Sequence, residues 1–256
     1  MKTPAATARV HRTAVRLLHD LGDVVFPPLC VHCQTLVEYS SGPALRHLCA
    51  KCASQLELVG PPHCTTCGHP FYGEVAGERL CPHCVGLDPA FDEGRTTVLF
   101  KGPARSLVIE LKYHRGLHVL HDIEALFRRN EHITGFVHDA TLVPVPLHSR
   151  KARERGYNQA ELLAEALARA ADGTARVEGL LRRVVDTETQ TAFDRRTRIR
   201  NLKNAFALAP RANLNPASRY ILVDDVFTTG STLNSCARVL RRAGALKLGV
   251  VTFGHG

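Results

Sequence analysis

Residues 220–232 place a short apolar run directly before two adjacent aspartates, a loop of small hydroxyl residues and glycine, and an amphipathic helix. The apolar run, 221–223, is short and largely β-branched, which is typical of a strand buried on both faces. Gly244 stands where the helix is expected to end. Apolar residues recur at helical spacing at Leu233, Cys236, Ala237 and Leu240. This strand–loop–helix order predicts an α/β fold.

The loop between this strand and this helix favours an anion. Backbone N–H groups at the start of a helix attract phosphate, and Gly230 lets the backbone approach a ligand closely. Asp224 and Asp225 would repel a bare phosphate, so we expect them to face ribose hydroxyls or a metal bound to the same ligand. The sequence therefore predicts a site for a phosphorylated sugar. It lacks a G-x-x-x-x-G-K-[ST] motif, which argues against a P-loop nucleoside triphosphatase.

This segment resembles the 5-phosphoribosyl-1-pyrophosphate (PRPP) loop of type I phosphoribosyltransferases. The resemblance implies that Asp224 and Asp225 contact the ribose 2′ and 3′ hydroxyls and orient the ribose in any catalysis. It also implies that PRPP binds together with Mg²⁺. The residues expected to hold the 5-phosphate are Thr228, Thr229, Gly230, Ser231 and Thr232.

Eight of the nine cysteines form C-x-x-C pairs, which are Cys30/Cys33, Cys49/Cys52, Cys64/Cys67 and Cys81/Cys84. Two such pairs complete a tetrahedral zinc site, and four-cysteine sites are structural because they keep no open position. A secretory signal is not visible, which makes disulfides the weaker interpretation. We expect one or two structural zinc ions. The simplest grouping is sequential, with the first two pairs on one ion and the last two pairs on another, and a cross-braced grouping stays open. The nearby His32, His47, His63, His69 and His83 are interpreted as surface or supporting groups.

Further strands are expected at 97–100, 141–145, 205–208 and 248–253, and they alternate with helices. This alternation predicts a parallel sheet covered on both faces, with ligands at the carboxyl ends of the strands. A strongly basic loop is expected at 147–156, and its Arg150, Lys151 and Arg155 would bind pyrophosphate. A solvated basic turn is the alternative. Residues 187–206 are rich in cations and read as an excursion from the sheet.

Nearly the whole chain is similar to the ComF (ComFC, GntX-like) family of late-competence proteins. The ordered features are 26–30 with the cysteine pairs, 111–113, 144–146, 155–159, Gln190, Arg198 and Asn201 before 205–206, and 224–230. In type I phosphoribosyltransferases a flexible hood closes over PRPP at the place of 187–206, which would bring Gln190 and Arg198 near PRPP. Contact of this segment's cations with nucleic acid, or with water alone, stays open. The ComF resemblance implies a role in natural transformation, handling incoming single-stranded DNA with a ComFA-type helicase and a DprA-type mediator.

The charge pattern fits a polyanion partner without proving one. The net charge is +9, whereas only 6% of residues are aromatic and tryptophan is absent. Single-strand binders usually stack bases on aromatic side chains, so backbone electrostatics would dominate any DNA binding here. No apolar run reaches the length of a membrane span, and no signal peptide is visible. We therefore expect a cytoplasmic protein, peripheral at the DNA-uptake site, with no membrane insertion.

The expected architecture is an α/β fold of the type I phosphoribosyltransferase class with an N-terminal zinc-ribbon module. The predicted units are an N-terminal helix (1–26), the zinc ribbon with four C-x-x-C pairs (27–88) and the phosphoribosyltransferase-like domain (89–256). The favoured function is PRPP binding in DNA uptake. The alternative is an active phosphoribosyltransferase with an unknown amine or base acceptor. A third possibility is a zinc-ribbon scaffold with a vestigial site. A glutaminase domain is not recognisable.

Overall fold

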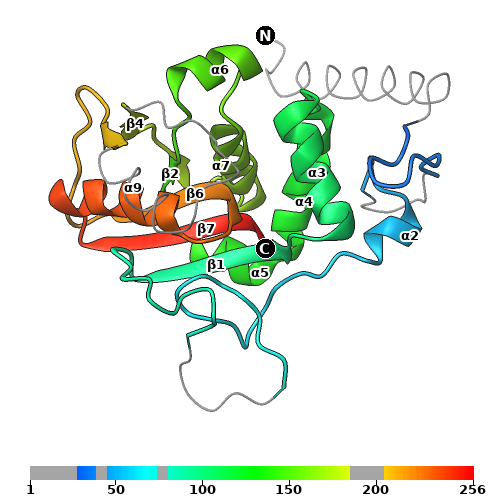
Figure 1. The fold of residues 1–256 in the computed structure, drawn as a ribbon, viewed down its shortest axis with the longest axis horizontal. Coiled ribbons are helices and arrows are strands. Elements are labelled where there is room, and N and C mark those ends of the chain that lie inside the picture. The colour runs from blue at the N-terminus through cyan, green and yellow to red at the C-terminus, as the bar shows by residue number, and fades with distance from the viewer. Residues whose placement is uncertain (1–27, 39–44, 74–79, 185–204) are drawn as a thin grey trace, which may run out of the picture.

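A parallel sheet of five strands forms the centre of the computed structural model, which describes residues 28–38, 45–73, 80–184 and 205–256. The strands lie in the order β1-β7-β6-β2-β3, and every neighbouring pair is parallel (Figure 1). Their bounds are β1 (Glu93–Leu99), β2 (Thr141–Pro144), β3 (Arg176–Val177), β6 (Arg219–Phe227) and β7 (Lys247–His255). The predicted parallel sheet is confirmed.

Helices cover both faces of the sheet, as a parallel sheet requires. Their bounds are α2 (Ala50–Ala53), α3 (Gly102–Tyr113), η1 (Leu117–Val119), α4 (Leu120–Arg129), α5 (Glu131–Phe136), α6 (Ser149–Arg155), α7 (Gln159–Ala170) and α9 (Ser231–Arg242). Alternate side chains of β6 enter two cores. Ile221 and Val223 pack with α3, α4 and α7, whereas Leu222 packs with α9. The period-2 alternation of the strand thus feeds both layers.

Two expectations about local structure were wrong. Residues 206–208 do form a strand, β5 (Phe206–Leu208), but it pairs antiparallel with β4 (Leu181–Arg183) outside the parallel sheet. The basic segment expected as a loop contains the helix α6. The His148 side chain accepts a hydrogen bond from the Arg150 N–H at its start, and Gly156 ends it in the left-handed conformation. Good helix formers between these two caps explain the outcome.

The first cysteine group packs on the face of the sheet that α3 and α4 cover. Its members are Cys30, Cys33, Cys49 and Cys52. Cys30 and Leu48 are buried in the core that these helices share. The buried Asp122 carboxylate on α4 accepts hydrogen bonds from the backbone N–H groups of Arg46 and His47, at 2.7 and 2.9 Å. These two bonds satisfy a carboxylate that would otherwise be costly to bury. The first cysteine group is therefore anchored to helices.

The second cysteine group packs into the core on the other face of the sheet, with β6 and α9. Its members are Cys64, Cys67, Cys81 and Cys84. The Thr96 hydroxyl on β1 donates to the Cys67 carbonyl at 2.9 Å. The Asn234 side chain on α9 accepts from the Ala90 N–H and donates to the Asp88 carbonyl, both at 2.8 Å. The second group therefore contacts the sheet and the helix that follows the aspartates.

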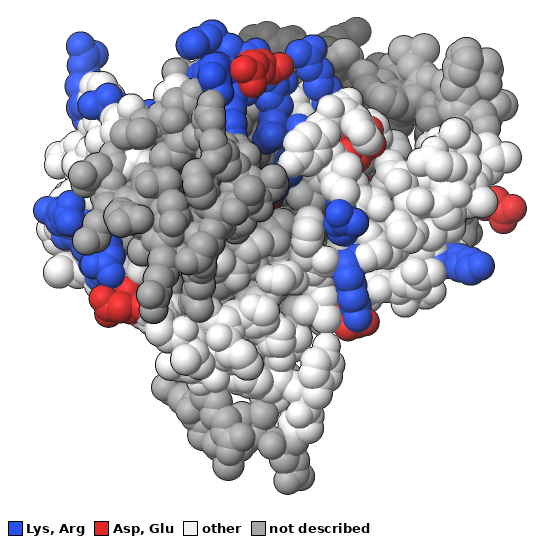
Figure 2. Space-filling view, viewed as in Figure 1, with Lys and Arg blue, Asp and Glu red and all other residues white. Residues whose placement is uncertain are grey.

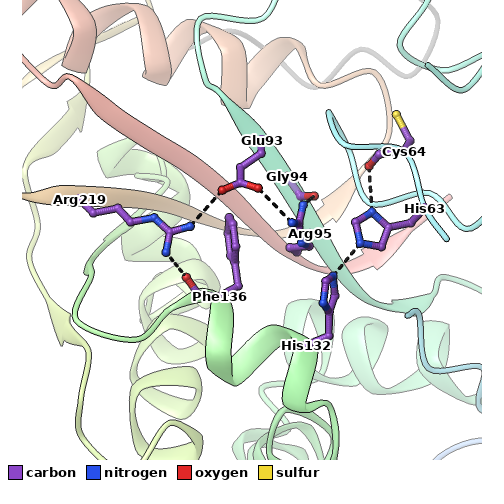
Figure 3. Close-up of polar contacts among 8 residues, drawn as sticks. All are labelled: His63, Cys64, Glu93, Gly94, Arg95, His132, Phe136 and Arg219. Atoms are coloured by element: carbon purple, nitrogen blue, oxygen red, sulfur yellow. Dashed lines mark hydrogen bonds and ion pairs between the residues drawn. The ribbon is translucent and has the colours of Figure 1, made fainter. Parts of the chain in front are cut away.

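Charged side chains close the amino end of the sheet (Figure 3). The Glu93 carboxylate lies 3.0 Å from Arg95 and 3.2 Å from Arg219. Both guanidinium groups lie over the Phe136 ring, and Arg219 also donates to the Phe136 carbonyl. A small cavity of about 180 Å³ opens beside Glu93 and Arg219. At this end each arginine is paired with a carboxylate and an aromatic face.

In the described part of the chain, no helix combines the length and the apolar character needed to cross a membrane. The predicted helix at 1–26 lies outside the described residues, as does nearly all of the predicted hood. The predicted domain boundaries stay predictions.

Candidate functional site

The two aspartates end the central strand β6, whose neighbours are β7 and β2. The Asp225 side chain is buried and the Asp224 side chain is partly exposed. Asp224 also accepts a hydrogen bond from the Asp225 N–H at 2.9 Å. The chain segments that follow β2 and β6 leave neighbouring strands at the same edge. This is the edge of a parallel sheet at which ligands bind.

Two side chains from separate helices hold the Asp225 carboxylate. Lys112 at the end of α3 donates to one oxygen at 2.7 Å, and Gln159 at the start of α7 donates to the other at 2.9 Å. Asp225 is therefore a fixed carboxylate with a charge partner.

The segment before α7 supports the position of Gln159. Arg155 donates to the Gln159 side-chain oxygen and lies over the Tyr113 ring at 5.7 Å. The Tyr157 hydroxyl donates to the Leu111 carbonyl, which ties the segment to the last turn of α3. Arg155, predicted as a pyrophosphate ligand, is thus connected to Asp225 by two successive hydrogen bonds through Gln159. The segments 111–113, 155–159 and 224–225 meet at one place.

The Asp224 carboxyl differs from its neighbour. The Asp224 carboxyl is only partly exposed, and this loss of hydration, followed by the negative charge of Asp225, raises the pKa of Asp224 from 3.8 to about 7. A carboxylate destabilised in this way is stabilised when hydroxyl donors or a cation approach it. Strongly perturbed pKa values of this kind gather at functional sites.

The predicted phosphate loop connects β6 to α9. Gly230 is the residue before α9 and has φ of 69°, a conformation that favours glycine. A Cβ atom at this position would stand 2.6 Å from the Phe227 ring and 3.1 Å from the Leu87 side chain. The hydroxyls of Thr229 and Ser231 bond each other at 2.9 Å. The backbone N–H groups of this loop therefore lie at the N-terminus of α9, a position that stabilises an anion.

The basic residues predicted for pyrophosphate lie on α6, which follows β2. Arg150 is exposed and lies 3.7 Å from Glu154, while Lys151 is half-buried. Figure 2 shows lysine and arginine side chains gathered over the part of the surface where Figure 1 places α6. Arg155 is bonded to the network around Asp225 through Gln159. Gln190 and Arg198 lie outside the described residues.

The eight paired cysteines gather as two groups of four, Cys30/Cys33/Cys49/Cys52 and Cys64/Cys67/Cys81/Cys84. This is the sequential grouping rather than the cross-braced one. Sulfurs of different pairs lie 3.3 to 3.8 Å apart where they approach most closely. Thiolates around one tetrahedral zinc stand roughly 3.8 Å apart. Both donor sets therefore fit zinc in chemistry and in spacing. Cys236 is buried on α9, where burial raises its pKa well above the usual value, so it is an inert core thiol.

Sequence reasoning missed two residues that hold Asp225, Lys112 and Gln159. Each lies in a segment that marks the resemblance to the ComF family, yet neither was predicted as a site residue. Nothing in a single sequence shows which side chain of such a segment points toward Asp225. The signal available was the presence of these segments together with the aspartate pair.

Known proteins resemble the chain over most of its length. A family model described as a double zinc ribbon domain matches residues 21–85. "Competence protein F" of Haemophilus influenzae is 31% identical over 86% of this chain and 94% of its own. "DNA utilization protein YhgH" of Escherichia coli is 32% identical over 86% and 93%, respectively. "Competence protein ComFC" of Bacillus subtilis is 25% identical over 77% and 79%. The ribbon match and the two cysteine groups support structural zinc.

Solved structures overlap a smaller part of the chain. A hypoxanthine phosphoribosyltransferase from Staphylococcus aureus is 12% identical, with a TM-score of 0.33 over 52% of this chain and 62% of that one. A purine phosphoribosyltransferase from Pyrococcus horikoshii is also 12% identical, with a TM-score of 0.32 over 54% and 83%. Overlap of this extent says nothing about the function of the chain.

Proposed function

The chain belongs to the ComF family of competence proteins, and from that premise we propose that it binds PRPP or a closely related phosphoribosyl ligand during DNA uptake. Relatives named for competence and DNA utilisation support the role in DNA uptake. The ligand is proposed from the geometry at the carboxyl end of β6.

The arrangement of the aspartate pair carries the proposal. Lys112 and Gln159 fix Asp225, and Asp224 is left with a pKa of about 7. A ribose with two neighbouring hydroxyls supplies the donors that such a pair accepts. The phosphate group of the same ligand would lie at the start of α9, where residues 228–232 offer backbone N–H groups and hydroxyls. One phosphorylated sugar therefore satisfies both halves of the site.

Metal ions have separate roles in this proposal. Each four-cysteine group would hold one structural Zn²⁺, so that all eight paired cysteines are ligands. Mg²⁺ prefers oxygen ligands and would arrive with the ligand's phosphates, with Asp224 as the protein oxygen beside it. When bound, Mg²⁺ neutralises pyrophosphate charge. Arg150, Lys151 and Arg155 supply further positive charge from α6 and its end.

The basic surface over α6 would contact single-stranded DNA without sequence preference. Phosphate contacts by lysine and arginine release counterions, so binding should weaken steeply as salt rises. A fluorescently labelled oligonucleotide measured at 50 and 200 mM salt tests this part. Affinity that hardly changes between the two conditions would contradict it. Handling of DNA in the cytoplasm, with a ComFA-type helicase and a DprA-type mediator, is proposed from the family resemblance alone.

Calorimetry with PRPP and Mg²⁺ tests the ligand directly. Wild type should bind, and the isosteric double variant Asp224→Asn/Asp225→Asn should bind about 100-fold more weakly, because two charge-assisted hydrogen bonds are lost. Glu93→Gln removes one carboxylate at the opposite end of the sheet and should bind like wild type. Absence of heat from folded wild type would overturn the proposal.

Transferase activity is a second candidate because of Asp224. A carboxyl with a pKa near 7 is suited to accept a proton at neutral pH. As the acceptor's nitrogen bonds to the ribose C1 and the bond to pyrophosphate breaks, that nitrogen's proton would pass to Asp224. Pyrophosphate release that depends on an added amine or base, and that Asp224→Asn abolishes, would support this activity. Equal release by both proteins would exclude Asp224 as the proton acceptor, and absence of acceptor-dependent release from wild type would exclude the activity.

A further inference from the structure

Three histidines that are far apart in the sequence meet beside the second cysteine group. His69 follows Cys67, His83 lies between Cys81 and Cys84, and His255 ends β7. The ring centroids lie 5.0 Å apart for His69–His83, 4.8 Å for His69–His255 and 4.9 Å for His83–His255. One ring nitrogen from each lies within 4.8 Å of the other two. This third group contains no cysteine and borders the second four-cysteine group.

Packing alone does not explain the arrangement. An imidazole carries two nitrogens that need partners when water is excluded. His69 Nδ1 is buried and has no hydrogen-bond partner within the described residues. His255 is buried as a whole, and its Nε2 lies 3.2 Å from Cys67 Sγ. A buried ring nitrogen without a partner, on a ring that lies beside two further imidazoles, is better explained by a ligand.

We propose that His69, His83 and His255 form a third metal site, which takes a divalent transition-metal ion such as Zn²⁺. Imidazole nitrogen is a common ligand of zinc, and three protein ligands leave a fourth position open. Nitrogens around a tetrahedral zinc stand roughly 3.3 Å apart. The present spacing of up to 4.8 Å must therefore shorten. His83 is exposed and can rotate to close the site.

The trihistidine site lies near the predicted phosphate loop. The end of β7 pairs with the end of β6, and the Phe227 ring stacks on His255 with centroids 5.3 Å apart and planes at 13°. Phe227 is also the ring against which Gly230 of the phosphate loop packs. Phe227 therefore lies between the trihistidine site and the loop proposed for PRPP. Unlike the four-cysteine groups, this site can exchange a water for a ligand atom.

Metal content per chain is the test. Protein equilibrated with a small excess of zinc and then desalted should hold three ions by mass spectrometry. His83→Asn should hold two, because one of three ligands is lost at an exposed position that the fold tolerates. His138→Asn is the matched control, since His138 is an exposed histidine just after α5 that pairs with Asp139 on the surface. It should hold three.

Cobalt spectroscopy distinguishes the ligands. Co²⁺ added to protein that already holds two zinc ions should give weak visible bands without the intense near-ultraviolet absorption of thiolate ligation. His83→Asn should abolish these bands. Two ions in both wild type and His83→Asn would overturn the proposal. Thiolate absorption from the added Co²⁺ would do so as well. Neither result depends on PRPP binding, so failure here leaves the proposed function standing.

Discussion

The carboxylates at the two ends of the parallel sheet are neutralised to different extents. At the amino end, Glu93 lies between Arg95 and Arg219, and both arginines rest on the Phe136 ring (Figure 3). At the carboxyl end, Asp225 is paired with Lys112, while Asp224 carries a pKa raised to about 7.

Under the proposed function, this difference separates structural charges from charges that await a ligand. A carboxylate with two cationic partners has little to gain from a further donor. Asp224 is the opposite case, because its ionised form is disfavoured until donors or a cation arrive. The same fold thus neutralises one end of its sheet and leaves the other end incompletely neutralised. Substitutions at the two ends should consequently have different effects.

Removing the cation from the carboxyl end should have the largest effect. Lys112→Ala leaves the buried Asp225 charge without its cationic partner, which costs about 3–5 kcal/mol of unfolding free energy. PRPP affinity should also fall, because Asp225 loses its fixed orientation. Urea denaturation and calorimetry measure the two effects. A stability loss below about 1 kcal/mol would show that Lys112 does not stabilise the buried Asp225 charge as described.

The pH dependence of stability should reveal Asp224. Its folded pKa is about 7 and the unfolded value is 3.8, so between these values the folded state holds a proton that the unfolded state has lost. Stability from this group therefore falls as pH rises from about 4 to 7, by at most roughly 1.4 kcal/mol per pH unit. Asp224→Asn should remove this decline, and Glu93→Gln should not. Parallel denaturation curves for wild type and Asp224→Asn across this range would contradict the raised pKa.

The smallest effect is expected at the amino end. Arg219→Ala leaves Glu93 paired with Arg95, so the unfolding free energy should fall by only about 1 kcal/mol. PRPP affinity should stay within twofold of wild type. A tenfold loss of affinity would mean that the two ends are coupled.

Much of the fold could be predicted because local signals agreed with it. The helix at 231–242 follows from apolar spacing, and β6 follows from its apolar run before the aspartates. The helix α6 was missed because its charged residues show no apolar period, although its helix formers and Gly156 were visible. The strand β5 was identified, but its partner was not, because pairing depends on tertiary contacts.

The site was predictable in part for a similar reason. The aspartate pair and the phosphate loop form one continuous segment, so the sequence displays them together. Lys112 and Gln159 reach Asp225 from two helices, and only the packing of α3 and α7 on the sheet brings them there. His255 joins His69 and His83 across the chain in the same way. Contacts between distant segments are not encoded in local spacing.

Amide hydrogen exchange of wild type with and without PRPP and Mg²⁺ tests the central claim most directly. The claim is that the carboxyl end of β6 binds the ligand while the amino end of the sheet is structural. Exchange should slow at residues 228–232, where backbone N–H groups would bond phosphate, and should not change at 93–95. Unchanged exchange at 228–232 under saturating PRPP, or protection confined to the amino end, would contradict the account.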